Sequence, residues 1–280
     1  MIQRNLMTDK FQAEAVRRIQ GGLEAARVVL SRFTPGAIEA EYKAGHDPVT
    51  EADRAVDVLL RQELLRDGEG WLSEESVDDL SRLEKDRIWV VDPLDGTREF
   101  VAGIPEFCVS IAMVEHGRPI AGGIYNPATG ETFIGSLETG LTYNGKSARV
   151  SQRKSLEGAL VLASRSEVKR GEWKSFENAP FKIQPMGSVA YKLARVSAGL
   201  ADLTFTLTPK HEWDVAAGAA LVESAGGFMS TLAATPFRCN NENPLISGLV
   251  AGAPGLRDEL FTALERQVQL VTRRPGGPGS

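Results

Sequence analysis

The sequence has few of the residues that build disulfide frameworks or zinc centres. It contains only two cysteines, Cys108 and Cys239, and three histidines, His46, His116 and His211, which are scattered along the chain. Zinc sites and disulfide scaffolds both need several such residues at close spacing. We therefore expect no zinc centre. Both cysteines should be buried apolar residues in a reducing compartment, and each histidine a surface or internally satisfied residue.

Long apolar runs and a global positive charge are also lacking. No stretch approaches the ~18 consecutive apolar residues of a membrane span, and the first residues do not resemble a secretory signal. The formal net charge is −5, so the chain has no global basic field for nucleic acid. We therefore predict a cytoplasmic enzyme that binds neither a membrane nor a nucleic-acid polymer. The Gly/Pro-rich residues 273–280 are predicted to be a disordered tail.

The hydrophobic pattern changes near residue 150 and predicts two domains. The first, residues 1–150, has helical periodicity followed by strands separated by turn signals, which indicates an α+β domain with an antiparallel sheet. The second, residues 151–272, alternates strands and helices and indicates an α/β domain. The expected helices are 8–31, one beginning after Thr50, 189–198, 213–225 and 256–268; the expected strands are 88–91, 107–114, 119–125, 131–136, 159–163, 182–184 and 201–206.

Acidic residues stand at the ends of several predicted elements. The densest group is Asp92-Pro93-Leu94-Asp95-Gly96-Thr97, directly after an apolar strand, where the carboxylates can face one side of a forced turn. Each acidic group also has a structural explanation: an ordinary turn for this run, a solvated loop for Glu74, a capping box with Thr50 for Asp53, and the helix dipole for Asp214. None of these explanations accounts for why an acidic group stands at the end or start of so many separate elements. Because magnesium takes oxygen ligands, a magnesium–carboxylate site is compatible with this spacing.

Two longer segments resemble signatures of the inositol monophosphatase superfamily. Residues 90–97, VVDPLDGT, are similar to its D-P-[IL]-D-G-T signature, and residues 213–218, WDVAAG, are similar to its W-D-x-A-A-G signature. The likeness covers roughly residues 40 to 230. The segments that agree in order between and around the signatures are 49–53, Glu74-Glu75, Gly187-Ser188 and 225–227.

The resemblance implies a fold, a cofactor and an activity. The fold is a layered α-β-α-β-α sandwich of the inositol monophosphatase and sugar phosphatase type, combining the α+β and α/β halves. The activity is a lithium-sensitive, magnesium-dependent phosphomonoesterase that acts on a small soluble phosphate ester with two or three Mg²⁺ per site. A homodimer is implied as well. The metal ligands carried over are Glu74, Asp92, Asp95, Asp214 and the backbone carbonyl of Leu94.

The resemblance also implies roles for other residues. Glu74 would orient the attacking water, and Thr97 with Asp53 would take its proton. The amides of Gly96 and Thr97 would receive phosphate oxygens. The full set of implied substrate contacts is Asp95, Gly96, Thr97, Arg98, Ser164, Arg165, Gly187, Ser188, Lys192 and Asp214.

The local sequence favours one branch of the superfamily for the substrate. Arg98-Glu99-Phe100 and Ser164-Arg165-Ser166 resemble segments of 3′(2′),5′-bisphosphate nucleotidases, so adenosine 3′,5′-bisphosphate is the predicted substrate. Leu207 stands where inositol monophosphatases carry an acidic residue that contacts substrate hydroxyls, and Glu212 is the candidate to replace it. Residues 101–105 instead resemble inositol or histidinol phosphatases. The cations offered for the second phosphate, each with solvated surface charge as its alternative reading, are Arg98, Lys43, Arg165 and Lys192.

The alternative substrates are therefore inositol 1-phosphate, histidinol phosphate and fructose 1,6-bisphosphate. Two further classes compete with the superfamily as a whole. A haloacid-dehalogenase-type phosphatase also carries an Asp-rich motif after a strand, but its aspartates are two positions apart, whereas Asp92 and Asp95 are three apart. A metal-binding module without turnover would keep the same fold, and no expected ligand is missing to support it.

Overall fold

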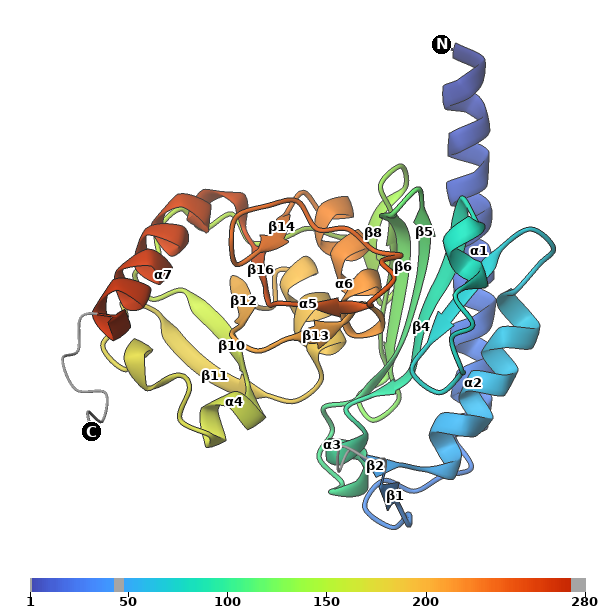
Figure 1. Cartoon of the computed structure of the whole chain (residues 1–280), viewed down its shortest axis with the longest axis horizontal. Coiled ribbons are helices and arrows are strands. Elements are labelled where there is room, and N and C mark those ends of the chain that lie inside the picture. The colour runs from blue at the N-terminus through green and yellow to red at the C-terminus, as the bar shows by residue number, and fades with distance from the viewer. Residues whose placement is uncertain (1, 43–47, 273–280) are drawn as a thin grey trace, which may run out of the picture.

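The computed structural model describes residues 2–42 and 48–272 as five alternating layers of helix and sheet (Figure 1). Lys43, His46 and the predicted tail 273–280 lie outside the described residues. The layers run from a helix pair through a large sheet, a central helix pair and a smaller sheet to an outer helix. The predicted α-β-α-β-α sandwich is confirmed. No helix in the described part of the chain is long and apolar enough to cross a membrane.

The first sheet has seven strands in sequence order, β3-β4-β5-β6-β7-β8-β9. β3 and β4 are parallel and the remaining neighbours are antiparallel, so the predicted meander is confirmed. Tight turns between alternating apolar strands favour such sequential pairing. The strands are β3 (Gly70–Ser73), β4 (Arg87–Asp95), β5 (Cys108–Glu115), β6 (Arg118–Asn126), β7 (Glu131–Ser136), β8 (Gly140–Tyr143) and β9 (Lys146–Ala148).

Two helices cover the outer face of this sheet, α1 (Ile2–Leu30) and α2 (Glu51–Leu64). α2 begins at the predicted capping box, in which the Asp53 carboxylate accepts from the Thr50 backbone amide. Its apolar positions recur at helical spacing and pack with α1 and the sheet into one core. Members of that core are Ile19, Leu23, Val56, Leu60, Val91 and Ile111.

The second sheet has five strands in the order β11-β10-β12-β16-β14, of mixed direction. The central helices α5 (Val189–Ser197) and α6 (Glu212–Ser224) lie between it and the first sheet. An aromatic core on its far face lies against α7 (Arg257–Thr272). The strands are β10 (Leu160–Ser164), β11 (Lys182–Met186), β12 (Leu203–Thr206), β14 (Phe228–Thr231) and β16 (Leu249–Gly252).

Short elements complete the described chain, and the boundary near residue 150 stays a prediction. One hydrophobic core contains residues of both halves, because α5 and α6 pack between the two sheets. The short elements are β1 (Glu41–Tyr42) paired with β2 (Pro48–Val49), β13 (Lys210–His211) paired with β15 (Leu245–Ile246), α3 (Thr97–Val101), α4 (Arg165–Lys169), and the 3₁₀ turns η1 (Ser81–Glu84), η2 (Lys174–Phe176) and η3 (Pro254–Leu256).

Glycine lets α6 approach the first sheet closely. A Cβ at Gly122 in β6 would stand 2.5 Å from the backbone oxygen of Ala217 in α6. A Cβ at Gly218 would stand 2.4 Å from the Cβ of Leu193 in α5. Both distances are far below van der Waals contact, so a side chain at either position would push the central helices out of place.

We predict that Gly122→Ala lowers the free energy of unfolding by about 1–3 kcal/mol, the usual effect of overpacking a close-packed core. The clash is with backbone, which cannot rotate away. Urea or guanidinium unfolding of the two proteins measures the difference.

Gly21→Ala is the matched control. Gly21 lies within α1 and a Cβ there would meet nothing within 4 Å, so alanine should raise stability by roughly 0.5–1 kcal/mol. A Gly122→Ala protein as stable as the original would contradict the close approach of α6.

Candidate active site

The acidic motif lies within a strand, and a bulge orients its two aspartates. The sequence predicted a turn after Val91, but β4 continues to Asp95. Asp92 lies opposite Ser110 and Asp95 opposite Cys108, so three steps on β4 match two on β5. In a regular strand, side chains three positions apart point to opposite faces. The extra residue of the bulge therefore lets both carboxylates face α5 and α6.

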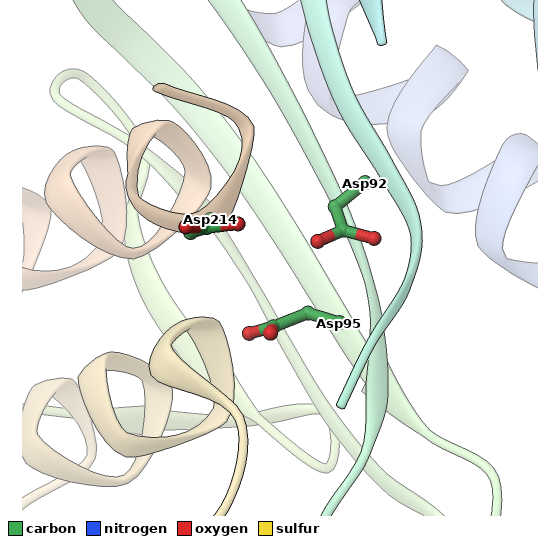
Figure 2. A group of neighbouring side chains, drawn as sticks. All are labelled: Asp92, Asp95 and Asp214. Atoms are coloured by element: carbon green, nitrogen blue, oxygen red, sulfur yellow. The ribbon is translucent and has the colours of Figure 1, made fainter. Parts of the chain in front are cut away.

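Three carboxylates meet where β4 faces α6. Asp92, Asp95 and Asp214 each offer an oxygen within 4.8 Å of the others (Figure 2). Asp92 and Asp95 come from β4, whereas Asp214 lies in the first turn of α6. Asp92 is only 1% exposed. The spacing of acidic residues in the sequence was compatible with one magnesium–carboxylate site, and the fold brings these three acids together.

Burial and mutual repulsion make this cluster electrostatically unfavourable by itself. Burial, reinforced by Glu74 and Asp95, raises the pKa of Asp92 well above its usual range. Burial, with Asp95 and Glu74 as further causes, does the same to the pKa of Asp214. Buried like charges need a compensating cation. The cluster offers only carboxylate oxygens, the donors that magnesium prefers.

Backbone amides hold all three carboxylates in place, and a hydroxyl also holds one of them; Asp92 Oδ1 accepts from the Leu94 amide at 2.9 Å. Asp95 Oδ2 accepts from Ser188 Oγ at 2.7 Å and from the Ala190 amide at 2.6 Å, at the start of α5. Asp214 Oδ2 accepts from the His211 amide at 2.9 Å, at the start of α6. The N-terminal amides of the two central helices thus orient these two acids.

Glu74 reaches the same cavity from the loop after β3. Both serines flanking that part of the loop bond to one buried residue of α2: Ser73 Oγ donates to Asp57 Oδ1 at 2.5 Å and Ser76 Oγ to Oδ2 at 2.7 Å. Sequence reasoning missed Asp57. The signal was its place four residues after Asp53, on the helix face that also buries Val56.

Thr97 and Asp53 lie in contact, as the resemblance implied. Thr97 Oγ is 2.9 Å from Asp53 Oδ1 and 3.0 Å from the Leu94 carbonyl, and its single proton serves one of them at a time. Asp53 Oδ2 accepts from the Thr50 amide at 2.8 Å and from its hydroxyl at 2.5 Å. Burial raises the pKa of Asp53, although these hydrogen bonds oppose it. The capping residue and the partner of Thr97 are therefore the same side chain.

The carboxylate cluster forms part of a polar cavity of about 330 Å³. All the metal ligands and substrate contacts implied by the resemblance line it except Leu94, which is fully buried, and Asp53, the partner of Thr97, lies outside the lining. The lining also contains residues that the sequence did not single out for the site. The complete lining is Glu74, Asp92, Asp95, Gly96, Thr97, Arg98, Glu99, Ser164, Arg165, Ser166, Met186, Gly187, Ser188, Val189, Lys192, Pro209, Lys210, His211, Trp213 and Asp214.

Two of the cations offered for a second phosphate are already engaged. Lys192 is 1% exposed, and its Nζ donates to the Ser188 carbonyl at 2.8 Å and to the two preceding carbonyls at 3.4 and 3.3 Å. Burial lowers the pKa of Lys192 to about 8. Arg165 forms an ion pair with Glu106, which also accepts from the Gly187 amide at 2.6 Å. The alternative reading of Lys192 as a solvated surface charge is therefore wrong.

The proposed replacement for the missing acidic contact is also wrong. Glu212 does not line the cavity and is fully buried. Its carboxylate accepts from the Asn240 amide at 2.6 Å and from the Asn241 amide at 2.9 Å. A side chain turned to a distant loop cannot contact a substrate hydroxyl.

Lys210 is the cation that sequence reasoning missed. It lines the cavity, and its Nζ lies 2.9 Å from Thr208 Oγ and 3.4 Å from Glu167 Oε1. Glu167 is fully buried and also accepts from Trp173. The only feature of the sequence that pointed to Lys210 was its position four residues before Asp214.

The cysteines lie as the composition predicted. Cys108 and Cys239 are free and buried, and burial raises both thiol pKa values well above the usual range. His116 and His211 are exposed, which confirms that expectation for the two described histidines. His211 additionally stacks on Trp213 at the cavity, with ring centroids 4.4 Å apart.

An all-carboxylate cluster in a cavity with amides and cations, within a five-layer sandwich, fits a metal-dependent phosphomonoesterase. The chain matches the model of the inositol monophosphatase family over residues 11–269. It belongs to the inositol monophosphatase family and is a magnesium-dependent phosphoric monoester hydrolase.

Named relatives and a solved structure agree with this assignment. The chain is 37% identical to inositol monophosphatase 2 of Solanum lycopersicum over 205 residues, 68% of this chain and 76% of the relative. It is 31% identical to Nus factor SuhB of Escherichia coli K12 over 266 residues, 89% and 97% of the two chains. The structure of a Thermotoga maritima IMPase superposes with a TM-score of 0.76 at 26% identity, covering 92% and 98%.

We predict that Asp95→Asn removes most phosphatase activity while the protein stays folded. The asparagine oxygen can still accept from Ser188 and Ala190, but the carboxylate charge is lost. Because metal-assisted charge stabilisation contributes several kcal/mol, kcat/KM should fall by a factor on the order of 100 or more. Steady-state kinetics at saturating Mg²⁺ measures the loss.

The same variant should lose most of the rise in Tm that Mg²⁺ gives the original protein. Asp202→Asn is the control: Asp202 is also buried but bonds to Ser151 and Leu160 of the second half. It should keep the magnesium-dependent rise. Near-original turnover of Asp95→Asn would contradict the role of Asp95 at the metal site.

Proposed function

We propose that this enzyme hydrolyses a small polyol monophosphate of the inositol 1-phosphate type. The observation that carries the proposal is the cavity of about 330 Å³, at the small end of the usual range for ligand pockets. Its polar rim suits hydroxyl groups: Ser164 and Ser166, whose hydroxyls lie 3.0 Å apart, stand on the wall with Glu99. A relative named inositol monophosphatase points to the same substrate class.

We propose that Glu74, Asp92, Asp95, Asp214 and the Leu94 carbonyl hold two or three Mg²⁺. When bound, magnesium would polarise the phosphoryl oxygens and neutralise charge on the leaving oxygen. The three clustered aspartates fit this role because their carboxylates have lost hydration and their oxygens lie within 4.8 Å of one another. Direct attack by water predicts no phosphoenzyme, which separates this chemistry from an aspartyl-nucleophile phosphatase.

Thr97 and Asp53 are proposed to take the proton of the attacking water. The Thr97 hydroxyl can accept that proton while passing its own to Asp53 Oδ1, 2.9 Å away. The raised pKa of Asp53 favours proton uptake, and the two Thr50 bonds keep its carboxylate oriented. Glu74 would orient the water; its loop is held by the bonds of Ser73 and Ser76 to Asp57.

The turn at Gly96 is proposed to bind the phosphate. Gly96 has φ +98°, and a Cβ there would stand 2.7 Å from the Glu106 carbonyl. Glycine is therefore needed for the backbone to turn at this point. The adjoining amides of Gly96 and Thr97 would donate to phosphate oxygens, while Ser188, Gly187 and Arg98 line the same cavity.

A 3′(2′),5′-bisphosphate nucleotidase is the second candidate, and Lys210 is the observation that favours it. A second phosphate needs cations, and Lys210 places an ammonium in the cavity. Against it, Lys192 and Arg165 are engaged within the protein. The relatives' names also favour the inositol reading.

The deciding experiment compares kcat/KM for inositol 1-phosphate, adenosine 3′,5′-bisphosphate, fructose 1,6-bisphosphate and histidinol phosphate at saturating Mg²⁺. We expect inositol 1-phosphate to be the best substrate. Lys210→Met should then change its kcat/KM little, because a neutral polyol makes small demand on a cation.

Lys169→Met is the matched control, since Lys169 is exposed on α4 outside the cavity lining. If adenosine 3′,5′-bisphosphate is hydrolysed fastest and Lys210→Met lowers that rate about tenfold or more, as for loss of a charged hydrogen bond, the nucleotidase reading replaces ours.

A further inference from the structure

A chain of hydrogen bonds connects the loop that carries Glu74 to the first turn of α6. Glu74 and Asp214 approach the cavity from segments far apart in sequence. Behind them, outside the cavity lining, lie five residues that bond to one another in series. We call this set the Arg82 relay; its members are Asp78, Arg82, Asn240, Asn241 and Glu212.

One end of the relay holds the loop after β3. The Arg82 side chain is only 1% exposed. Its Nη2 donates to Asp78 Oδ2 at 2.8 Å, and Nε donates to the same carboxylate at 3.0 Å. Asp78 follows Glu74 by four residues. A two-pronged bond between a guanidinium and a carboxylate fixes direction as well as distance.

The middle of the relay is a short loop of the second half. Arg82 Nη1 donates to Asn240 Oδ1 at 2.7 Å, and Nη2 donates to the Asn241 carbonyl at 2.9 Å. Asn240 returns a bond from Nδ2 to the Arg82 carbonyl at 3.3 Å. Three hydrogen bonds therefore fix the loop that contains Asn240 and Asn241 to Arg82.

The other end of the relay holds the start of α6. Glu212 is fully buried and begins the helix, two residues before Asp214. Its two oxygens accept from the backbone amides of Asn240 and Asn241, and Oε1 also accepts from Asn241 Nδ2 at 2.6 Å. The Glu212 amide in turn donates to the Pro244 carbonyl at 2.8 Å.

We propose that Arg82, Asn240 and Glu212 are positioning residues that set Glu74 relative to Asp214 and thereby determine the affinity for Mg²⁺. The proposal rests on the ligand roles under the proposed function. Stability alone gives a weak reason for this arrangement, because apolar residues of similar volume often replace buried ionic groups without loss. Residues behind metal ligands commonly orient them.

Asn240→Gly tests the proposal with the least disturbance. Asn240 has φ +64°, which glycine adopts without strain and alanine does not. The substitution removes the side-chain bonds to Arg82 but keeps the backbone amide that donates to Glu212. We expect the Kd for Mg²⁺ to rise about tenfold, the lower end for such residues. Isothermal titration calorimetry and the magnesium-induced rise in Tm both measure it without any substrate.

Asn144→Gly is the matched control. Asn144 also has positive φ, +48°, and its side chain accepts from the Thr132 amide at 2.9 Å. It lies between β8 and β9, outside the cavity lining. Its Kd for Mg²⁺ should equal that of the original protein.

Arg82→Lys and Glu212→Gln test the two ends. Arg82→Lys keeps the positive charge but loses the forked guanidinium that bonds to Asp78 and to the asparagines at the same time. Glu212→Gln replaces one acceptor oxygen with an NH₂ group, which cannot accept from the amides of Asn240 and Asn241. Each should also raise the Kd for Mg²⁺. Because both act through one connection, the double variant should raise it by less than the product of the single effects.

Lower Tm with an unchanged Kd for Mg²⁺ in these variants would overturn the proposal, since that is the result for a purely structural network. An unchanged Tm and Kd would overturn it too. Failure of the substrate proposal is distinguished by absence of inositol 1-phosphate hydrolysis by the original protein. Failure of the ligand roles is distinguished by normal Mg²⁺ binding by Asp95→Asn.

Discussion

Repulsion between buried carboxylates is the constraint on which the rest of this structure depends. Asp92, Asp95 and Asp214 lie within 4.8 Å of one another by their oxygens, and burial raises the pKa of each. An arrangement that opposes its own charge must be held by the surrounding fold. Here the central helix layer does so, because α5 and α6 direct N-terminal amides at two of the acids and glycine brings α6 tightly against β6. The site therefore exists only as a product of the layered fold.

Features that depend on residues close together in the chain could be predicted from the sequence, such as the acidic motif and the helix caps. Helix α2, its capping box and the strands of the meander lie where the pattern predicted them. The four carboxylates that the resemblance carries over as metal ligands line one cavity. The continuation of β4 was missed, since a Pro-Leu-Asp-Gly run is typical of turns and only pairing with β5 shows a bulge.

Residues with distant partners were not readable. Glu212 bonds to a loop 28 residues further on, and Lys192 turns its ammonium to the carbonyls before its own helix. Either side chain would look the same in sequence if it faced the substrate. The preference for a nucleotidase rested on short resembling segments, which do not show that Arg165, one of the cations offered for a second phosphate, is paired with Glu106. Specificity depends on which charges are already satisfied, and only the fold shows that.

Because two cations of the cavity are paired with acids, an acidic protein needs another source of positive charge to take a phosphate dianion. The cavity is lined by Glu99 and by the carboxylates of Glu74, Asp92, Asp95 and Asp214, which we call its floor. At its rim, Arg165 is paired with Glu106 and Lys210 with Glu167. Such pairs cancel much of each other's field, so the rim alone does not offset the floor. In a chain of net charge −5, divalent cations bound by these carboxylates would supply the attraction for the phosphate. The same acids that make the cluster unfavourable without metal would therefore make substrate binding conditional on metal.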